Sequence, residues 1–127
     1  MNKSTAQTVA IIGASEKEGR YATKALELLL EKGHCVLPIN PRIQQVLDLK
    51  CFPSIEAIPQ NITIDTYTIY VRPEHLESYI KPILQRGNAR VIFNPGTESV
   101  VHEAELQEAG LEVIEACTIV MLQTNQF

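Results

Sequence analysis

The chain has 127 residues, of which 45% are apolar and 20% charged, and its formal charge at pH 7 is -4. This length and composition predict one globular domain over residues 1–127, and the acidic balance argues against a nucleic-acid surface, which needs dense lysine and arginine. The amino-terminal stretch is polar and the sequence has no apolar run of about 18 residues, so we expect no signal peptide and no membrane span. The three cysteines lack the paired spacing of a zinc site and favour a cytoplasmic protein.

The first predicted element is an apolar strand from Val9 to Ile12 that lacks polar alternation. Such a run is typical of a parallel strand that is covered on both faces. Apolar residues from Tyr21 to Leu30 recur at helical spacing, so residues 14–19 form the turn between strand and helix. We expect the loop from Gly13 to Ser15 to present its backbone N–H groups to an anion, near the positive end of the helix dipole.

The second predicted strand runs from His34 to Asn40 and contains Pro38. Proline cannot donate to the hydrogen-bond ladder, which favours a bulge or pairing on one side only. Further strands are predicted over 66–71, 89–93 and 111–114, helices over 74–86 and 98–109, and short helical turns over 43–47 and 54–58.

A regular spacing links two of these strands. Gly33 stands seven positions before Asn40-Pro41, and Gly87 stands seven positions before Asn94-Pro95. A glycine stop, a strand and an Asn-Pro turn repeated in this way fit a βα architecture, whose crossovers bring all carboxyl ends of the strands to one side. The sequence therefore predicts a Rossmann-like, doubly wound, parallel five-stranded α/β sheet in the order 3-2-1-4-5, with helices on both faces and a ligand crevice at those ends.

Basic side chains lie on the loops that border this crevice, namely Lys17, Arg20, Arg42 and Arg72. Arginine can hold phosphate oxygens two at a time, so the loops favour a polyanionic ligand.

The dinucleotide fingerprint G-x-G-x-x-G is poorly matched, because only Gly13 of its three glycines is present. The second strand ends in Asn40-Pro41-Arg42, without the carboxylate that would bind the ribose of NAD. An arginine there would instead accept a phosphate on the ribose, as carried by NADP on the 2' oxygen and by coenzyme A on the 3' oxygen.

Four stretches together resemble the stand-alone CoA-binding domain proteins, which are similar to the N-terminal domain of the succinyl-CoA synthetase α subunit. The stretches are V-A-I-I-G-A-S at 9–15, V-L-P-I-N-P at 36–41, K-C-F-P-S-I-E-A-I-P at 50–59 and A-G-L-E-V-I-E-A-C at 109–117. The resemblance implies a domain that binds coenzyme A, with the diphosphate near residues 13–15, the nucleotide end near residues 40–42, and loops 71–73 and 94–96 along the pantetheine. The resemblance covers the nucleotide-binding domain of the synthetase and not the domain that carries its phosphorylated histidine, so it does not imply ligase chemistry.

We therefore expect non-catalytic binding of coenzyme A or an acyl-CoA, a small-molecule ligand, with no membrane or nucleic-acid partner, no metal and no catalytic residue. An NADP-dependent oxidoreductase and a partner-interaction domain with a vestigial nucleotide pocket are the alternatives. A homodimer is a possible assembly, although no clear apolar patch predicts one. The expected cofactor contacts are Gly13, Ala14, Ser15, Lys17, Arg20, Asn40, Pro41, Arg42, Val71, Arg72, Pro73, Asn94, Pro95, Gly96 and Cys117, whose thiol could form a mixed disulfide with coenzyme A.

Overall fold

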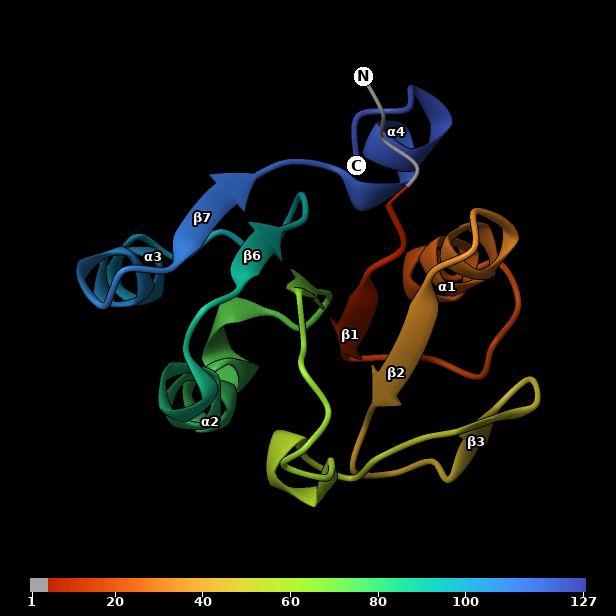
Figure 1. The fold of residues 1–127 in the computed structure, drawn as a ribbon, viewed down its shortest axis with the longest axis horizontal. Coiled ribbons are helices and arrows are strands. Elements are labelled where there is room, and N and C mark those ends of the chain that lie inside the picture. Colours follow the sequence, from red (N-terminus) through yellow and green to blue (C-terminus); the bar gives the residue numbers. More distant parts are fainter. Residues whose placement is uncertain (1–4) are drawn as a thin grey trace.

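A five-stranded parallel sheet forms the centre of the computed structural model, which describes residues 5–127. Its order is β2-β1-β5-β6-β7, from β1 (Thr8–Ile12), β2 (Cys35–Ile39), β5 (Thr66–Ile69), β6 (Arg90–Phe93) and β7 (Glu112–Glu115). Helices α1 (Tyr21–Glu31) and α4 (Thr118–Gln123) cover one face, and α2 (Glu77–Arg86) and α3 (Val100–Glu108) cover the other (Figure 1). The predicted parallel sheet with helices on both faces is confirmed.

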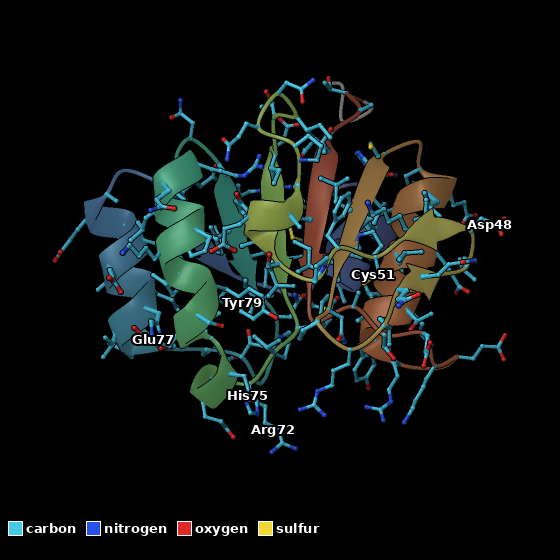
Figure 2. All side chains as sticks on the ribbon, turned by 90° about the horizontal axis from the view of Figure 1, so that it is seen from below. Asp48, Cys51, Arg72, His75, Glu77 and Tyr79 are labelled. Carbon is cyan, nitrogen blue, oxygen red and sulfur yellow. The ribbon has the colours of Figure 1, made fainter. Side chains whose placement is uncertain are left out.

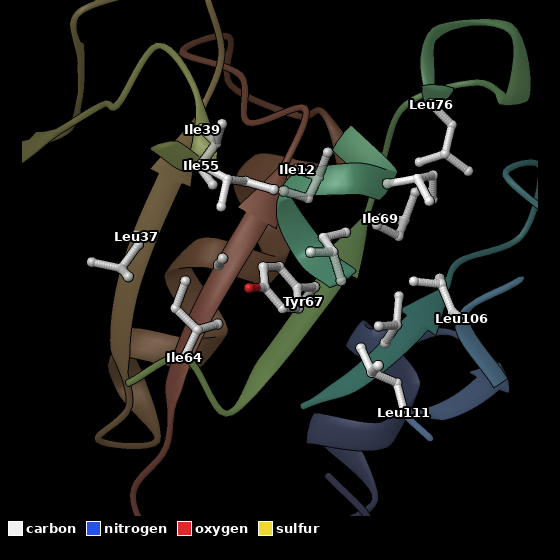
Figure 3. Close-up of a cluster of buried hydrophobic side chains, with 14 of the residues drawn as sticks. Ile12, Leu37, Ile39, Ile55, Ile64, Tyr67, Ile69, Leu76, Leu106 and Leu111 are labelled. Atoms are coloured by element: carbon white, nitrogen blue, oxygen red, sulfur yellow. The ribbon is translucent and has the colours of Figure 1, made fainter. Parts of the chain in front are cut away.

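The absence of polar alternation in β1 follows from burial on both faces. Val9 and Ile11 pack into the cluster that contains the apolar face of α1, while Ala10 and Ile12 pack into the cluster under α2. All four side chains are fully buried. Figure 3 shows the larger of the two clusters, in which residues from β1, β2 and β5 meet Leu76 and side chains of α2 and α3.

The predicted strand order is wrong at one position. The order 3-2-1-4-5 would place the third strand, residues 66–69, outside the second, whereas this strand, β5, pairs with β1 on the side away from β2. The strands therefore follow each other as 2-1-3-4-5 in chain order, and β2 lies at an edge of the sheet.

Pro38 gives the physical reason for this arrangement. Its carbonyl oxygen accepts a hydrogen bond from the Phe52 N–H on the outer side of β2, at 2.9 Å. The nitrogen of the same residue faces the same outer side, where no neighbouring strand requires a donor. An inner position for β2 would leave one ladder bond unmade, so Pro38 favours the edge.

The connection from β2 to β5 wraps around this edge. Where a helical turn was predicted over 43–47, the chain forms an antiparallel hairpin of β3 (Gln45–Val46) and β4 (Leu49–Lys50). The prediction over 54–58 is confirmed as the 3₁₀ turn η1 (Ile55–Ala57). A second turn, η2 (Pro73–His75), precedes α2, and in residues 5–127 no helix has both the length and the apolar character to cross a membrane.

Candidate functional site

A cleft of about 570 Å³ opens at the carboxyl ends of β1, β2 and β5. It lies where parallel α/β sheets generally bind ligands. Its walls come from the loops after these strands and from the first turns of α2; Figure 2 shows Arg72 and His75 at this end of the molecule, with Tyr79 nearer the sheet. The lining residues are Gly13, Asn40, Pro41, Arg42, Tyr70, Val71, Arg72, His75, Ser78 and Tyr79.

The cleft is electropositive in an acidic protein. Among the described residues that line it are three cationic or protonatable side chains, Arg42, Arg72 and His75, and no carboxylate. The chain as a whole has 15 acidic and 11 basic residues, so the composition of this lining departs from that of the chain. Glu74 approaches Arg72 to 3.8 Å, but both side chains are largely exposed, and such a pair is weak. The cleft is therefore suited to an anion.

The first two backbone N–H groups of the loop after β1 form hydrogen bonds with β2. The N–H groups of Gly13 and Ala14 both donate to the Ile39 carbonyl, at 3.0 and 3.1 Å, and Ala14 is 1% exposed. Both amides therefore have a partner in β2 in this structure, and their expected contact with a diphosphate stays a prediction.

Gly13 serves the packing of the strand ends. Its φ is +92°, and a Cβ at this position would lie 2.8 Å from Val71 Cγ1 and 3.0 Å from the Tyr70 carbonyl carbon. The glycine thus permits the ends of β1 and β5 to approach each other and gives the cleft its floor.

The remainder of this loop lies outside the cleft. Ser15 Oγ accepts from the Lys17 N–H at 3.1 Å, and Thr23 Oγ1 donates to the carbonyls of Ser15 and Lys17. Lys17 and Arg20 are exposed. These contacts close the loop over the start of α1, and Ser15, Lys17 and Arg20 are not among the residues that line the cleft.

Asn40 fixes one rim of the cleft. Its Nδ2 donates to the Ala14 carbonyl at 2.8 Å, and its Oδ1 accepts from the Arg42 N–H at 2.7 Å. The backbone N–H of Asn40 donates to the Phe52 carbonyl at 3.0 Å. The side chain therefore ties the loop after β2 to the loop after β1 and positions the backbone of Arg42.

The second Asn-Pro turn has a different environment. Asn94 is 2% exposed; its Nδ2 donates to Thr68 Oγ1 and the Ile69 carbonyl, and its Oδ1 accepts from the Thr118 N–H. The side chain thus joins β5, β6 and α4 inside the protein. The remaining predicted contacts, Pro73, Pro95, Gly96 and Cys117, also lie outside the cleft lining.

Besides residues among the expected cofactor contacts, the cleft is lined by Tyr70, His75, Ser78 and Tyr79. The last three precede or open α2. Tyr79 is partly buried and packs against the core cluster. The polar residues His75 and Ser78, one helical turn apart, are the sequence signal for this wall of the cleft.

Burial controls the ionisation of groups near the cleft. It raises the pKa of Tyr79, an effect reinforced by Cys51, and it raises the pKa of the Cys51 thiol. The Tyr70 hydroxyl is buried, and burial raises its pKa far above the ordinary value. These three groups are neutral at pH 7. Among the described residues, no group of three or more His, Cys, Asp or Glu is placed to hold a metal ion.

The fold and the cleft define a Rossmann-like domain whose ligand crevice lies at the carboxyl ends of its strands. The CoA binding domain family matches residues 7–123, and the chain belongs to this family. It is 31% identical over 106 residues to an ADP-forming acetate–CoA ligase I of Archaeoglobus fulgidus, covering 84% of this chain but 14% of the ligase. The chain thus spans a small part of that relative.

Solved structures of small proteins match nearly the whole chain. A hypothetical protein from Pyrococcus horikoshii is 28% identical, with a TM-score of 0.89 over 98% of this chain and 87% of that one. A second crystal structure, of an uncharacterized protein, is 35% identical, with a TM-score of 0.89 over 97% of this chain and 99% of that one. The family and the α/β fold are therefore shown by independent comparisons.

Proposed function

We propose that the protein binds coenzyme A or an acyl-CoA in the cleft at the ends of β1, β2 and β5, and that this binding is non-catalytic. The single observation that carries the proposal is the lining itself, which within residues 5–127 contains Arg42, Arg72 and His75 and no carboxylate. Coenzyme A carries a diphosphate and a separate 3'-phosphate, so it complements a cleft with several cationic groups. The family and the relatives named as CoA ligases support the same ligand.

Arg42 is the residue to which we assign the 3'-phosphate. It follows β2, at the position where nucleotide-binding sheets read the ribose, and its guanidinium is exposed to an incoming ligand. Asn40 holds the Arg42 backbone through a 2.7 Å hydrogen bond. The less polar surfaces of Pro41, Val71 and Tyr79 in the same cleft supply the contacts that the adenine and the pantetheine need.

The non-catalytic part of the proposal is supported by the chemistry of the lining. A nucleophile or base works when a neighbouring group activates it through a hydrogen bond. In the part of the chain that the structure describes, the Ser78 hydroxyl, the His75 ring and the Tyr79 hydroxyl of the cleft are not hydrogen-bonded to one another, whereas His102, outside the cleft, bonds Ser99 and Glu77. We therefore assign the cleft to ligand recognition.

Thermal unfolding in the presence of coenzyme A, acetyl-CoA, NADP and NAD tests the proposal. A ligand at a hundredfold its dissociation constant raises the free energy of unfolding by about 2.7 kcal/mol, which shifts the midpoint by several degrees for a domain of this size. A shift with coenzyme A or acetyl-CoA alone supports the proposal. A shift with NADP alone favours an oxidoreductase, and no shift with any of the four favours an interaction domain.

A further inference from the structure

Strand β7 is the open edge of the sheet, at the end away from β2 (Figure 1). The outer side of β2 is covered, because Phe52 donates to the Pro38 carbonyl and accepts from the Asn40 N–H. In residues 5–127, no strand pairs with the outer side of β7. An uncovered edge presents backbone groups that can pair with another chain. The sheet can therefore accept a further strand beside β7.

The backbone of β7 has two residues whose polar groups face outward. The N–H groups of Glu112 and Ala116 donate to the residue before β6 and to its last residue, at 3.3 and 3.1 Å. Successive residues of a strand direct their backbone groups to alternate sides, so those of Val113 and Glu115 face away from β6. The side chains of Val113 and Ile114 are only partly buried. The edge therefore offers hydrogen-bonding groups together with apolar surface on both faces of the strand.

The surface around this edge is acidic. All 11 lysines and arginines lie in residues 1–90, whereas residues 91–127 contain six glutamates and no lysine or arginine. In the described part of the chain, none of these glutamates forms an ion pair with lysine or arginine. Burial raises the pKa of Glu103, and the neighbouring Glu115 and Glu98 raise it as well. The six are Glu98, Glu103, Glu105, Glu108, Glu112 and Glu115.

We propose that the outer edge of β7 binds an extended segment of a partner protein with the pattern basic-apolar-apolar-basic, which adds to the sheet as an antiparallel strand. The sequence of β7, Glu-Val-Ile-Glu at 112–115, determines this pattern. Residues directly opposite each other on antiparallel strands share a face, and opposite charges there stabilise the pair. A basic residue therefore complements each glutamate, and an apolar residue complements Val113 or Ile114.

The proposal goes beyond the proposed function. In this mode of recognition the main-chain hydrogen bonds supply the affinity and the side chains supply the specificity. No residue of the cleft lining belongs to residues 91–127. The partner segment and coenzyme A would therefore occupy separate sites.

A second copy of this chain is a poorer occupant of the edge. Pairing of two β7 strands would bring two of these acidic surfaces together, and like-charge juxtaposition opposes association. Short length and charged side chains commonly protect edge strands from self-pairing, and β7 has four residues with a glutamate at each end. The charges that hinder self-association favour a basic strand.

Amide hydrogen exchange of the wild-type protein, followed by NMR, tests the proposal with the synthetic peptide acetyl-Thr-Arg-Val-Val-Arg-Thr-amide. In the free protein the Val113 and Glu115 amides should exchange faster than the Ile114 amide, which faces β6. With the peptide at ten times its dissociation constant, exchange at Val113 and Glu115 should slow about tenfold. The same peptide N-methylated at its four central residues keeps the charges but loses the backbone donors, and should give no protection.

Two variants with the same change in net charge separate the edge from the overall charge of the protein. Glu112→Gln/Glu115→Gln removes both edge charges and should weaken peptide binding about fivefold. Glu27→Gln/Glu31→Gln removes two charges from α1 and should leave peptide binding nearly unchanged. All four glutamates are exposed, so both variants should keep the wild-type unfolding midpoint.

The outcomes decide between the possible occupants of the edge. Equal binding of the N-methylated peptide, or binding without protection of Val113 and Glu115, overturns the proposal because the contact would then be electrostatic only. No binding at millimolar peptide, or equal weakening by the two variants, overturns it as well. Protection of the two amides that rises with protein concentration in the absence of peptide would assign the edge to a second copy. None of these measurements uses coenzyme A, so the proposed function is tested separately.

Discussion

Asn40 Nδ2 donates to the Ala14 carbonyl oxygen at 2.8 Å, which joins the ends of two neighbouring parallel strands. The Oδ1 of the same side chain accepts from the Arg42 N–H at 2.7 Å. One amide group therefore holds both the loop after β1 and the residue to which we assign the 3'-phosphate. A residue expected to touch the ligand acts here chiefly through the backbone that surrounds it.

Replacement of Asn40 by alanine should lower the free energy of unfolding by about 1–3 kcal/mol, chiefly because the part-buried Ala14 carbonyl loses its partner, while the exposed Arg42 N–H can turn to water. Urea unfolding measures this loss. Asn61→Ala is the matched control, since Asn61 is exposed in a loop and its loss should stay within about 0.5 kcal/mol. Losses of equal size in the two variants would show that the Asn40 hydrogen bonds do not stabilise the rim.

Arg42→Ala should weaken binding of coenzyme A about tenfold and leave binding of dephospho-CoA nearly unchanged, because only coenzyme A carries the 3'-phosphate that the guanidinium would contact. Calorimetric titration with both ligands measures the two affinities. Lys24→Ala removes an exposed positive charge from α1. It controls for the effect on ligand affinity of losing any one positive charge from the protein surface. Equal losses for the two ligands would assign Arg42 to another part of the ligand.

Gly13→Ala should destabilise the protein by more than Gly33→Ala, although both glycines have nearly the same positive φ, +92° and +90°. A Cβ on Gly13 meets Val71 Cγ1 at 2.8 Å, whereas a Cβ on Gly33 meets no atom within 4 Å. Gly33→Ala therefore measures the backbone strain alone, about 1 kcal/mol or more, and the difference between the variants measures the contact between the ends of β1 and β5. The same loss for both would show that Val71 moves aside without cost.

The helices and strands were predictable where a local stretch of sequence determines the element. Strand β1 is apolar along its length because both of its faces are buried, and this requirement is visible in the sequence whatever the strand's neighbours are. The order of the strands depends on which pairs form across the sheet. The one local signal was Pro38, which predicted a bulge or pairing of β2 on one side only, and the second of these is met by the position of β2 at the edge.

The candidate site was less predictable because its loops interact with one another. The sequence placed Arg42, Arg72 and Val71 at the crevice, and they line it. The sequence did not reveal that the Ile39 carbonyl would accept the two amides of the loop after β1, since the predicted adjacency of these two strands does not fix how the loops after them hydrogen-bond. Asn40 and Asn94 occupy equivalent turns, yet one borders the cleft and the other is buried, because only the second is covered by α4.

His34 should make the stability of the protein fall as the pH drops below about 6.5. The side chain is 8% exposed, its Nδ1 accepts from the Gln7 N–H at 3.0 Å, and its pKa is lowered by burial and, to a lesser extent, by Arg90. The unfolded chain therefore binds a proton at this histidine at a higher pH than the folded protein does. Below about pH 6.5 the unfolded state holds more protons, so the free energy of unfolding decreases as the pH falls.

Urea unfolding between pH 7.5 and about 5 checks this expectation in the wild type, His34→Gln and His75→Gln. His34→Gln removes the titrating group and keeps an acceptor, so its stability should depend less on pH than that of the wild type. His75→Gln should keep the wild-type dependence, because His75 is exposed and forms no part of the contact with Gln7. Curves of the same steepness for wild type and His34→Gln would mean that His34 binds its proton equally well in the folded and unfolded chain.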